Sequence, residues 1–315
     1  MRMIKMILDV DTGIDDALAI AYAIASPEIE LLGITVTYGN TPIDNAFQNT
    51  CELLERIHTQ IPVYKGAEKP ISRSAHFSSV FHGTDGLGET LGKADGVDHI
   101  SADAVDFIIE QVNKYGPNLT IVTTGPVTNL AQAIMKDPSI ITRVGSVVTM
   151  GGAVTTPGNV NKFAEANIFI DPEAADMVLR SELPITLVGL DVTRKTLLTQ
   201  KDMQRWRSME TGLSTLFADF TEYYLNVYQK YYPFLGGCAL HDPLAVAVAK
   251  DPSLVRTIPM FLKVDLEQDA LGRTAEDLQR ASLSGPNTFV SVQVDSERFM
   301  NDFYNRLDLV LKGSE

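Results

Sequence analysis

The feature that most constrains the fold is the alternation of short apolar runs with helical segments through the first two thirds of the chain. The runs that predict strands are Ile4–Val10, Leu31–Thr37, Leu119–Thr123, Ser146–Met150 and Ile185–Val188. The segments between them that predict helices are Asp16–Ala25, Asp44–His58, Ala102–Lys114, Val127–Lys136 and Pro172–Arg180. Because such alternation builds βαβ units, the sequence predicts an α/β fold with an open, mainly parallel sheet flanked by helices.

The last third of the chain predicts helical elaboration after residue 190. Apolar residues recur at helical spacing over Leu213–Tyr231, which indicates a long helix. Two apolar runs, Pro259–Val264 and Phe289–Val294, predict further strands, and a closing helix is expected after Asp295. The sequence contains no internal repeat or clear linker, so we expect residues 1–315 to form a single domain.

The charge balance and the cysteines narrow the class of protein. There are 26 Lys and Arg against 40 Asp and Glu, a formal charge of −14. This acidity argues against nucleic-acid or anionic-membrane partners, which are bound by basic patches. The apolar run Met6–Val10 contains Asp9 and is too short for a signal peptide or a membrane span. Two cysteines far apart, Cys51 and Cys238, favour a reduced, cytoplasmic compartment.

The largest cluster of candidate functional residues lies directly after the first predicted strand. Asp9, Asp11, Asp15 and Asp16 place four carboxylates within eight residues, at the strand end where ligands of α/β sheets bind. Asp9 and Asp11 face one side on extended backbone, and Gly13 permits a tight turn before the next helix. Helix capping explains one or two of these aspartates, but not four. Converging carboxylates repel each other without a cation, and oxygen ligands select Ca²⁺ or Mg²⁺.

The residues that follow three other predicted strands also indicate a ligand-binding site at this edge of the sheet. Each is followed by a small or glycine-rich segment, and oxygen atoms are offered at Asn40, Thr123 and Thr124. Glycine after a strand is ordinary turn chemistry, so each segment alone is a weak signal. Their shared position along one sheet edge is stronger.

Taken in order, the motifs of this chain resemble those of the inosine–uridine nucleoside hydrolase family. The resemblance covers nearly the whole chain and is carried by Asp9–Asp16, Val36–Asn40, His82–Gly88, Thr124–Leu130, Met150–Gly152, Gly158–Asn159, Glu165–Asn167, Asp171–Ala175 and His241–Pro243. The first motif alone is moderately specific, whereas the ordered set is highly specific.

The resemblance implies a Ca²⁺-dependent ribonucleoside hydrolase and assigns roles to individual residues. It implies Ca²⁺ ligation by the carboxylates of Asp11, Asp16 and Asp242 and by the backbone carbonyl of Thr124, with Asp11 also the general base. The residues implied to hold the ribose hydroxyls are Asp15, Asn40, Met150, Asn159, Glu165 and Asn167. His82 and His241 are implied on the nucleobase side. The resemblance also implies a homodimer or homotetramer.

Two positions depart from the family pattern. Thr12 stands where proline is common, which costs some rigidity of the loop. Ala166 stands where an aromatic residue is frequent between the Glu and the Asn, which changes how this chain would contact the base.

The sequence contains four Asp-Pro pairs. Such a pair is typical of an aspartate that caps the start of a helix whose first residue is proline. We accept that interpretation for three of them, which are Asp137, Asp171 and Asp251. Asp242 differs because His241 precedes it and a Gly-Gly turn leads into it. We expect Asp242 to bind a metal and His241 to donate a proton to the leaving base.

Residues around the expected base side were weighed against purely structural roles. His82 lies in a glycine-rich stretch, so we expect it to be accessible. Tyr224, Tyr228 and Tyr231 share one helix face, and core packing is the favoured interpretation, although Tyr228 or Tyr231 could reach the base.

Glycosidic cleavage passes through an oxocarbenium-like ribosyl state, in which Asp11 would take a proton from the attacking water and His241 would assist the leaving base. Two alternatives remain open from sequence. A Mg²⁺-dependent phosphatase of the haloacid-dehalogenase type also begins with Asp-x-Asp, but it leaves Asp15-Asp16 and His241-Asp242 unexplained. A noncatalytic nucleoside or pentose binder would need the diol contacts but no base.

Overall fold

The computed structural model describes residues 3–91, 103–280 and 285–313. Its centre is an eight-stranded sheet in the order β3-β2-β1-β4-β5-β6-β12-β9. The strands are β1 (Ile4–Val10), β2 (Ile29–Val36), β3 (Val63–Lys65), β4 (Leu119–Thr123), β5 (Ser146–Met150), β6 (Ile185–Val188), β9 (Val255–Met260) and β12 (Thr288–Val294). Neighbouring strands run parallel except β12 and β9. The predicted open, mainly parallel sheet is therefore confirmed.

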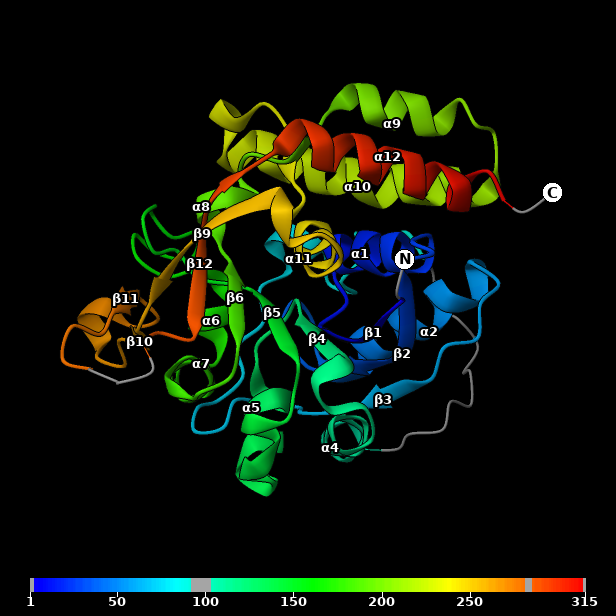
Figure 1. Cartoon of the computed structure of the whole chain (residues 1–315). Helices are drawn as coiled ribbons and strands as arrows, with labels where there is room; N and C mark the ends of the chain where they lie inside the picture. Colours follow the sequence, from blue (N-terminus) through cyan, green and yellow to red (C-terminus); the bar gives the residue numbers. More distant parts are fainter. Residues whose placement is uncertain (1–2, 92–102, 281–284, 314–315) are drawn as a thin grey trace.

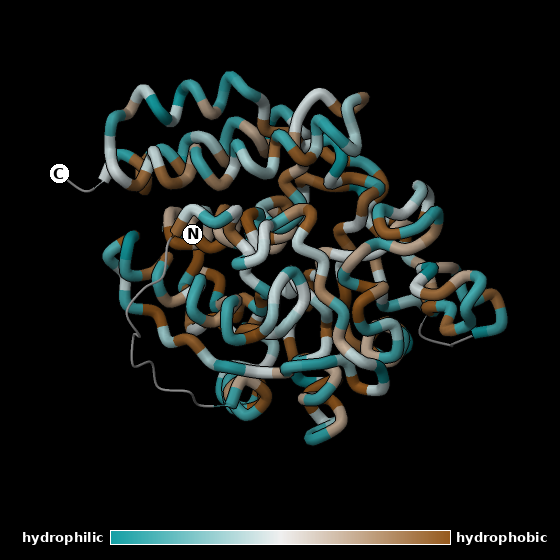
Figure 2. The backbone as a smooth tube through the Cα atoms, turned by 180° about the vertical axis from the view of Figure 1, so that it is seen from behind, coloured by the Kyte–Doolittle hydropathy of each residue, from teal (hydrophilic) through white to brown (hydrophobic). Residues whose placement is uncertain are grey.

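The central strands are apolar on both faces because both faces of the sheet are covered. In β1, Met6 and Leu8 belong to one core cluster and Ile7 to the other. A strand buried on both sides carries a continuous apolar run rather than an alternating one. The hydrophobic colouring of the central strands in Figure 2 follows this pattern, with hydrophilic stretches concentrated on the outer helices.

Helices form layers on both sides of the sheet (Figure 1). On one side, α1 and α11 pack against each other, and α10 and α12 pack outside them. On the other side, α5 packs against α4 and α7. The longer helices are α1 (Ile14–Ile24), α2 (Ile43–Arg56), α4 (Ala104–Tyr115), α5 (Thr128–Lys136), α7 (Pro172–Arg180), α9 (Gln200–Arg207), α10 (Gly212–Tyr231), α11 (His241–Lys250) and α12 (Ser296–Leu311). The predicted helical elaboration after residue 190 is confirmed.

Several short elements were not predicted. The short helices are α3 (Ser79–His82), α6 (Ala166–Ile170) and α8 (Leu190–Thr193). Two small antiparallel pairs join β7 (Leu197–Leu198) to β8 (Cys238–Ala239) and β10 (Leu262–Val264) to β11 (Thr274–Glu276). Elements of two to five residues are too short to show a hydrophobic period, which explains why the sequence did not reveal them.

Most predicted boundaries lie within two residues of the observed ones, with one clear error. The predicted strand Pro259–Val264 is wrong, because the chain changes sheets at Phe261: β9 ends at Met260 beside β12, whereas β10 pairs with β11. Pro259 is tolerated because β9 is an exposed edge strand. The predicted start of α4, Ala102, lies outside the described residues.

Every helix in the described part of the chain is either too short or too polar to span a bilayer.

The strand order places a crevice beside β1. From β1 the chain moves outward to β2 and β3, then returns to β4 on the other side of β1 and continues to β5 and β6. In open α/β sheets, ligands bind at the carboxyl ends of strands where the order reverses in this way. Asp11 follows β1 and Thr124 follows β4, so both lie at this reversal point.

Asn129 on α5 ties the strands together beneath that point. Its side chain is fully buried, and its Nδ2 donates to Asp9 Oδ1 at 2.8 Å and to the Val36 carbonyl at 3.3 Å. Its Oδ1 accepts the backbone N–H of Ala67 at 2.8 Å. One amide thus links β1, β2 and the segment after β3.

Replacing Asn129 by Ala should lower the free energy of unfolding by about 2–4 kcal/mol, because each buried polar group left unpaired costs ~1–3 kcal/mol. Urea denaturation measures the loss. Gln132→Ala, on the more exposed side of the same helix, is the matched control and should change stability by under about 0.5 kcal/mol. Equal stability of the two variants would show that the Asn129 bonds do not hold the strand ends.

Candidate active site

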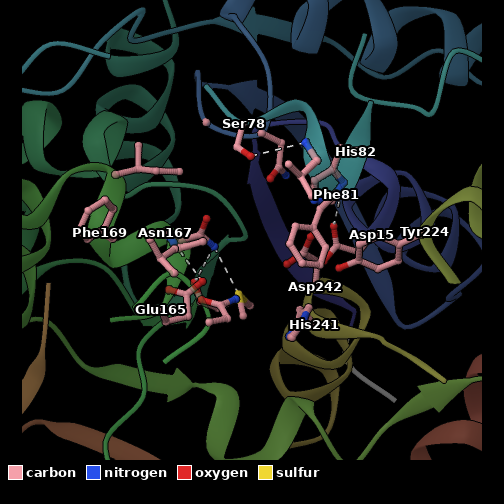
Figure 3. A pocket seen from close by; sticks show the side chains of 18 of the residues that line it. Asp15, Ser78, Phe81, His82, Glu165, Asn167, Phe169, Tyr224, His241 and Asp242 are labelled. Atoms are coloured by element: carbon pink, nitrogen blue, oxygen red, sulfur yellow. Dashed lines mark hydrogen bonds and ion pairs between the residues drawn. The ribbon is translucent and has the colours of Figure 1, made fainter. Parts of the chain in front are cut away.

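A cavity of about 510 Å³ opens at the carboxyl edge of the sheet (Figure 3). It brings together predicted site residues from seven separate parts of the chain. The predicted site residues that line it are Asp15, Asn40, His82, Thr124, Met150, Asn159, Glu165, Asn167, His241 and Asp242. Asp11 and Asp16 are fully buried and are linked to the floor of this cavity through Asn40 and Asp242.

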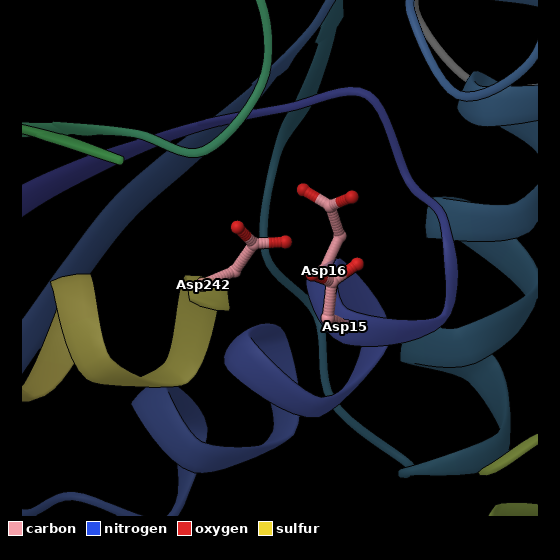
Figure 4. A group of neighbouring side chains, drawn as sticks. All are labelled: Asp15, Asp16 and Asp242. Atoms are coloured by element: carbon pink, nitrogen blue, oxygen red, sulfur yellow. The ribbon is translucent and has the colours of Figure 1, made fainter. Parts of the chain in front are cut away.

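Three carboxylates meet at the floor of the cavity. Asp15, Asp16 and Asp242 each offer an oxygen within 4.8 Å of the others (Figure 4). Burial, followed by the charge of Asp16, raises the pKa of Asp15 to about 8. Burial and the charges of Asp15, Asp16 and Asp11 hold the pKa of Asp242 well above its usual range. The cluster therefore stays ionised at neutral pH only when a cation compensates it.

Asp11 and Asp16 are fixed by donors from neighbouring strand ends. Asp16 accepts hydrogen bonds from the backbone N–H of Gly13 at 2.9 Å, from Thr124 Oγ1 at 2.7 Å and from Asn40 Nδ2 at 3.2 Å. Asp11 Oδ2 accepts the backbone N–H of Asn40 at 2.6 Å. Asp11 Oδ1 is buried and has no hydrogen-bond partner among the described residues. An unpaired carboxylate oxygen beside a buried acidic cluster fits a hard divalent cation.

Asp9 does not join this group, contrary to the expectation that all four aspartates of the motif converge. Its Oδ1 accepts from Thr35 Oγ1 at 2.5 Å and from Asn129 at 2.8 Å, and Asp9 does not line the cavity. Burial raises the pKa of Asp9 to about 7. Its role in the structure is to join strand ends beneath the cavity.

Asn167 connects the carbonyl groups at the ends of β4 and β5. Its Nδ2 donates to the Thr124 carbonyl at 2.6 Å and lies 3.3 Å from the Met150 carbonyl. A carbonyl oxygen has two lone pairs, so Thr124 keeps one for a second partner.

The short helix α6 positions Glu165 and Asn167 at the cavity. Glu165 is the N-cap of α6, and its carboxylate accepts three backbone N–H groups, those of Gly152 at 3.0 Å, Asn167 at 3.0 Å and Ile168 at 3.2 Å. Asn167 is inside the first turn of that helix. These three hydrogen bonds fix the Glu165 carboxylate at the cavity.

His82 was expected to be accessible, but it is 7% exposed. Its Nδ1 accepts the backbone N–H of Ile14 at 3.0 Å, so the neutral ring carries its proton on Nε2. Burial lowers the pKa of His82 to about 3. His82 is therefore a neutral hydrogen-bond donor on the cavity wall.

His241 lies between two hydroxyl groups. Its Nε2 is 2.6 Å from the Tyr228 hydroxyl, and its Nδ1 is 2.7 Å from Thr193 Oγ1. Burial, followed by the charge of Arg194, lowers the pKa of His241 to about 3, so the ring is neutral near pH 7. Asp242 is inside the first turn of α11 and Leu240 is the cap residue, which rules out a capping role for Asp242.

The other three Asp-Pro predictions are confirmed. Each aspartate caps a helical turn by accepting a backbone N–H, and the pairs are Asp137 with Ser139, Asp171 with Ala174 and Asp251 with Ser253.

Aromatic side chains line the end of the cavity near His82 and His241. Tyr224 and Tyr228 are buried in the core and also line the cavity, so the packing interpretation was correct only in part. Sequence reasoning missed Phe81, whose ring centroid lies 5.7 Å from that of Tyr228 and 5.8 Å from that of Tyr231. Its place directly before His82 was the available signal.

Comparison with known proteins identifies the family of this chain. The sequence profile of the inosine-uridine preferring nucleoside hydrolase matches residues 6–301. The chain belongs to this family. It is 36% identical over 300 residues to the inosine-uridine preferring nucleoside hydrolase of Crithidia fasciculata, covering 94% of each chain. It is 32% identical to the pyrimidine-specific ribonucleoside hydrolase RihA of Salmonella gallinarum, covering 96% of this chain and 98% of RihA.

A solved structure gives the same result. The purine-preferring ribonucleoside hydrolase from Gardnerella vaginalis superposes with a TM-score of 0.94 at 44% identity, covering 98% of this chain and 99% of that one. The protein is thus a nucleoside hydrolase, an enzyme that cleaves the N-glycosidic bond of ribonucleosides with water. Neither a phosphatase nor a noncatalytic binder is favoured.

Metal removal should make the stability of this protein depend on pH. The pKa values of Asp11, Asp15 and Asp242 are raised in the folded state, so their contribution to the stability of the metal-free protein is complete below about pH 4 and is lost as pH rises towards 8. We expect the Tm of chelated protein to fall between pH 5 and 8, and millimolar Ca²⁺ to restore it at pH 8. Ligand at a hundredfold excess over Kd adds ~2.7 kcal/mol.

The control for this experiment is Asp242→Asn, which should reduce both the pH dependence and the response to Ca²⁺. A Tm at pH 8 that Ca²⁺ leaves unchanged in the unaltered protein would show that the cluster does not hold this ion.

Proposed function

We propose that this protein is a Ca²⁺-dependent hydrolase that releases ribose and a free base from purine or pyrimidine ribonucleosides. The observation that carries the proposal is the floor of the cavity, where Asp15, Asp16 and Asp242 converge and their neighbour Asp11 has an Oδ1 without a hydrogen-bond partner among the described residues. Neutral histidines and tyrosines line the cavity beside these carboxylates and offer a surface that suits a nucleobase. RihA is named as pyrimidine-specific and the Gardnerella vaginalis enzyme as purine-preferring, so both classes of nucleoside are candidate substrates.

The proposed ligands of the ion are the carboxylates of Asp11, Asp16 and Asp242 and the carbonyl of Thr124. All are oxygen atoms, which supports Ca²⁺ or Mg²⁺ over softer metals, and a site built from several protein oxygens rather than from water molecules favours Ca²⁺. When bound, such an ion would orient the ribose diol and lower the pKa of a water molecule.

The ribose hydroxyls would be held by Asp15, Asn40, Met150, Asn159, Glu165 and Asn167. Asn159 supports this role because its Oδ1 is buried without a partner among the described residues, so a ribose hydroxyl can donate to it. Its backbone is fixed from both sides, since its N–H donates to Ala164 at 3.0 Å and its carbonyl accepts the Tyr232 hydroxyl at 3.1 Å. A sugar held this firmly reaches the reactive geometry at low entropic cost.

Asp11 is the proposed general base. Its Oδ2 is held by Asn40, which leaves Oδ1 free to accept a proton from water attacking C1′. The raised pKa of Asp11 makes it a better proton acceptor than an exposed aspartate. The surrounding carboxylates also stabilise the positive charge that develops on the ribosyl ring.

His241 is proposed to assist the departing base through Tyr228. Because its pKa is lowered to about 3, His241 is neutral near pH 7 and must take up a proton from solvent before it can act as an acid. The Tyr228 hydroxyl lies 2.6 Å from its Nε2 and also lines the cavity. The step uses the imidazolium form of His241, which passes its Nε2 proton to the tyrosine oxygen as the tyrosine proton moves to the base and is left as the neutral ring.

We further propose that residues 1–315 act as one domain, in the cytoplasm, as a homodimer or homotetramer. The two free, buried cysteines support a reducing compartment, because no disulfide is needed for the fold.

Released ribose from inosine, adenosine, uridine and cytidine tests the function directly. Asp11→Asn should lower kcat at least about 10²-fold on the best substrate, the scale of a lost general base. Asp137→Asn, which alters a distant helix cap, is the matched control and should retain activity. No ribose release from any nucleoside by the unaltered protein would refute the function.

His241→Ala should lower turnover of natural nucleosides by about 10²-fold and spare p-nitrophenyl riboside, whose leaving group needs no proton. Tyr228→Phe should show the same selectivity if the proton passes through its hydroxyl. Equal loss on both kinds of substrate would indicate damage to the metal site through Asp242 instead.

A further inference from the structure

One residue of the cavity, Asn159, is carried by an irregular loop between β5 and α6. The neighbours Pro157 and Val160 are exposed, which places the loop at the surface. Asn159 nevertheless lines the cavity, and its Oδ1 is buried without a partner among the described residues. A side chain that meets a ligand from such a loop needs a fixed backbone, because ordering a free loop on binding costs entropy.

The turn around Asn159 is closed by its own backbone. The N–H groups of Asn159 and Val160 donate to the Ala164 carbonyl at 3.0 and 3.2 Å. A Cβ added at Gly158 would lie 2.2 Å from the same carbonyl oxygen, so this close approach requires glycine. These contacts set the shape of the turn on its inner side.

Arg194, the C-cap of α8, holds the outer side of the turn. Its Nη1 donates to the Pro157 carbonyl at 2.8 Å and its Nη2 to the Gly158 carbonyl at 2.9 Å. Hydrogen bonds from a charged donor are roughly twice as strong as neutral ones, and the planar guanidinium fixes their direction. One side chain therefore fixes the two residues that precede Asn159.

The same short helix holds the beginning of the loop. Asp191 in α8 accepts the backbone N–H of Val154 at 3.1 Å and that of Thr155 at 2.6 Å. Asp191 and Arg194 are three residues apart, so they lie on one side of a helical turn. α8 thus fixes the loop at two points, and Arg194 provides the point next to Asn159.

Tyr232, the C-cap of α10, contacts both Asn159 and Arg194. Its hydroxyl donates to the Asn159 carbonyl at 3.1 Å, and the Arg194 guanidinium lies 5.8 Å from the centroid of its ring. A cation over an aromatic face is attracted to it. Together, Arg194 and Tyr232 bind three consecutive carbonyl groups, those of residues 157–159.

The two helices that carry these residues also hold His241. Thr193, next to Arg194, contacts Nδ1 of the imidazole, and Tyr228, one turn before Tyr232, contacts Nε2. The proposed sugar contact and the proposed leaving-group acid therefore share their supports. As a result, α8 and α10 determine where the loop lies relative to His241.

We propose that Arg194 is a positioning residue that, together with Tyr232, places Asn159 for its contact with ribose. Arg194 does not line the cavity, so it acts through the carbonyl groups that it binds. Displacing a sugar contact by about 1 Å can lower the rate by up to about 10²-fold. This inference rests on the proposed function and extends it to a residue outside the cavity.

The test measures kcat/KM for p-nitrophenyl riboside, whose leaving group needs no proton, so that effects on His241 do not enter. Arg194→Met removes both donors and should lower kcat/KM about 10-fold, within the range expected for a displaced contact. Arg194→Lys keeps the charge but lacks the planar fork, so it should lose about as much. Lys195→Met removes the adjacent, exposed positive charge; it is the matched control and should keep kcat/KM unchanged.

A double-mutant cycle with Asn159→Ala separates positioning from structural damage. If Arg194 acts through Asn159, adding Arg194→Met to Asn159→Ala should lower kcat/KM by less than about 2-fold further. Structural damage would instead reduce the active fraction by the same factor in both backgrounds. Tyr232→Phe removes a single hydroxyl and serves as the second variant if Arg194→Met does not fold. It should lower kcat/KM about 3-fold alone and have no further effect beside Asn159→Ala.

Equal losses in the two backgrounds overturn the positioning role alone, and so does full activity of Arg194→Met or Arg194→Lys. An unchanged kcat/KM in Asn159→Ala refutes the sugar contact of Asn159 and the inference with it. Absence of hydrolysis of every nucleoside and of p-nitrophenyl riboside by the unaltered protein refutes the proposed function itself.

Discussion

The repulsion between buried carboxylates is the constraint on which the rest of this structure depends. Asp11, Asp15, Asp16 and Asp242 come from two helices and a strand end, and burial raises the pKa of each one. Such a cluster persists only if donors fix it and a cation or protons neutralise it. The surrounding contacts meet the first need, because Gly13, Asn40 and Thr124 all donate to it. The parallel sheet brings these donors to one edge.

The sequence predicted the sheet and the residues of the site well because both have strong local signals. Buried parallel strands are continuous apolar runs, and the motif from Asp9 to Asp16 stands directly after one of them. The resemblance to a family then supplied Asp242, which lies far along the chain. Side-chain direction was less predictable. Asp9 turns to Asn129 rather than to the site, and Glu165 caps a helix of five residues, because tertiary partners decide both.

The burial of the site residues also could not be predicted from the sequence. His82 has glycine neighbours that indicate a loop, yet the helix α10 covers it with Tyr224 at a ring distance of 5.2 Å. The lost hydration keeps both His82 and His241 neutral near pH 7, so His82 is a hydrogen-bond donor and His241 must be protonated before it can act as an acid. The change of sheets at Phe261 could not be predicted either, because a single apolar run in the sequence contains residues of both β9 and β10.

The chain order of the site has a consequence for biosynthesis. The first aspartates emerge from the ribosome with β1, but Asp242 on α11 follows more than two hundred residues later, and β12 enters the sheet between β6 and β9 later still. A nascent chain therefore carries an incomplete acidic cluster and an unfinished sheet edge during most of its translation. For such a topology we expect chaperones to protect that edge during translation. We expect the cluster to bind its metal only after the chain is released.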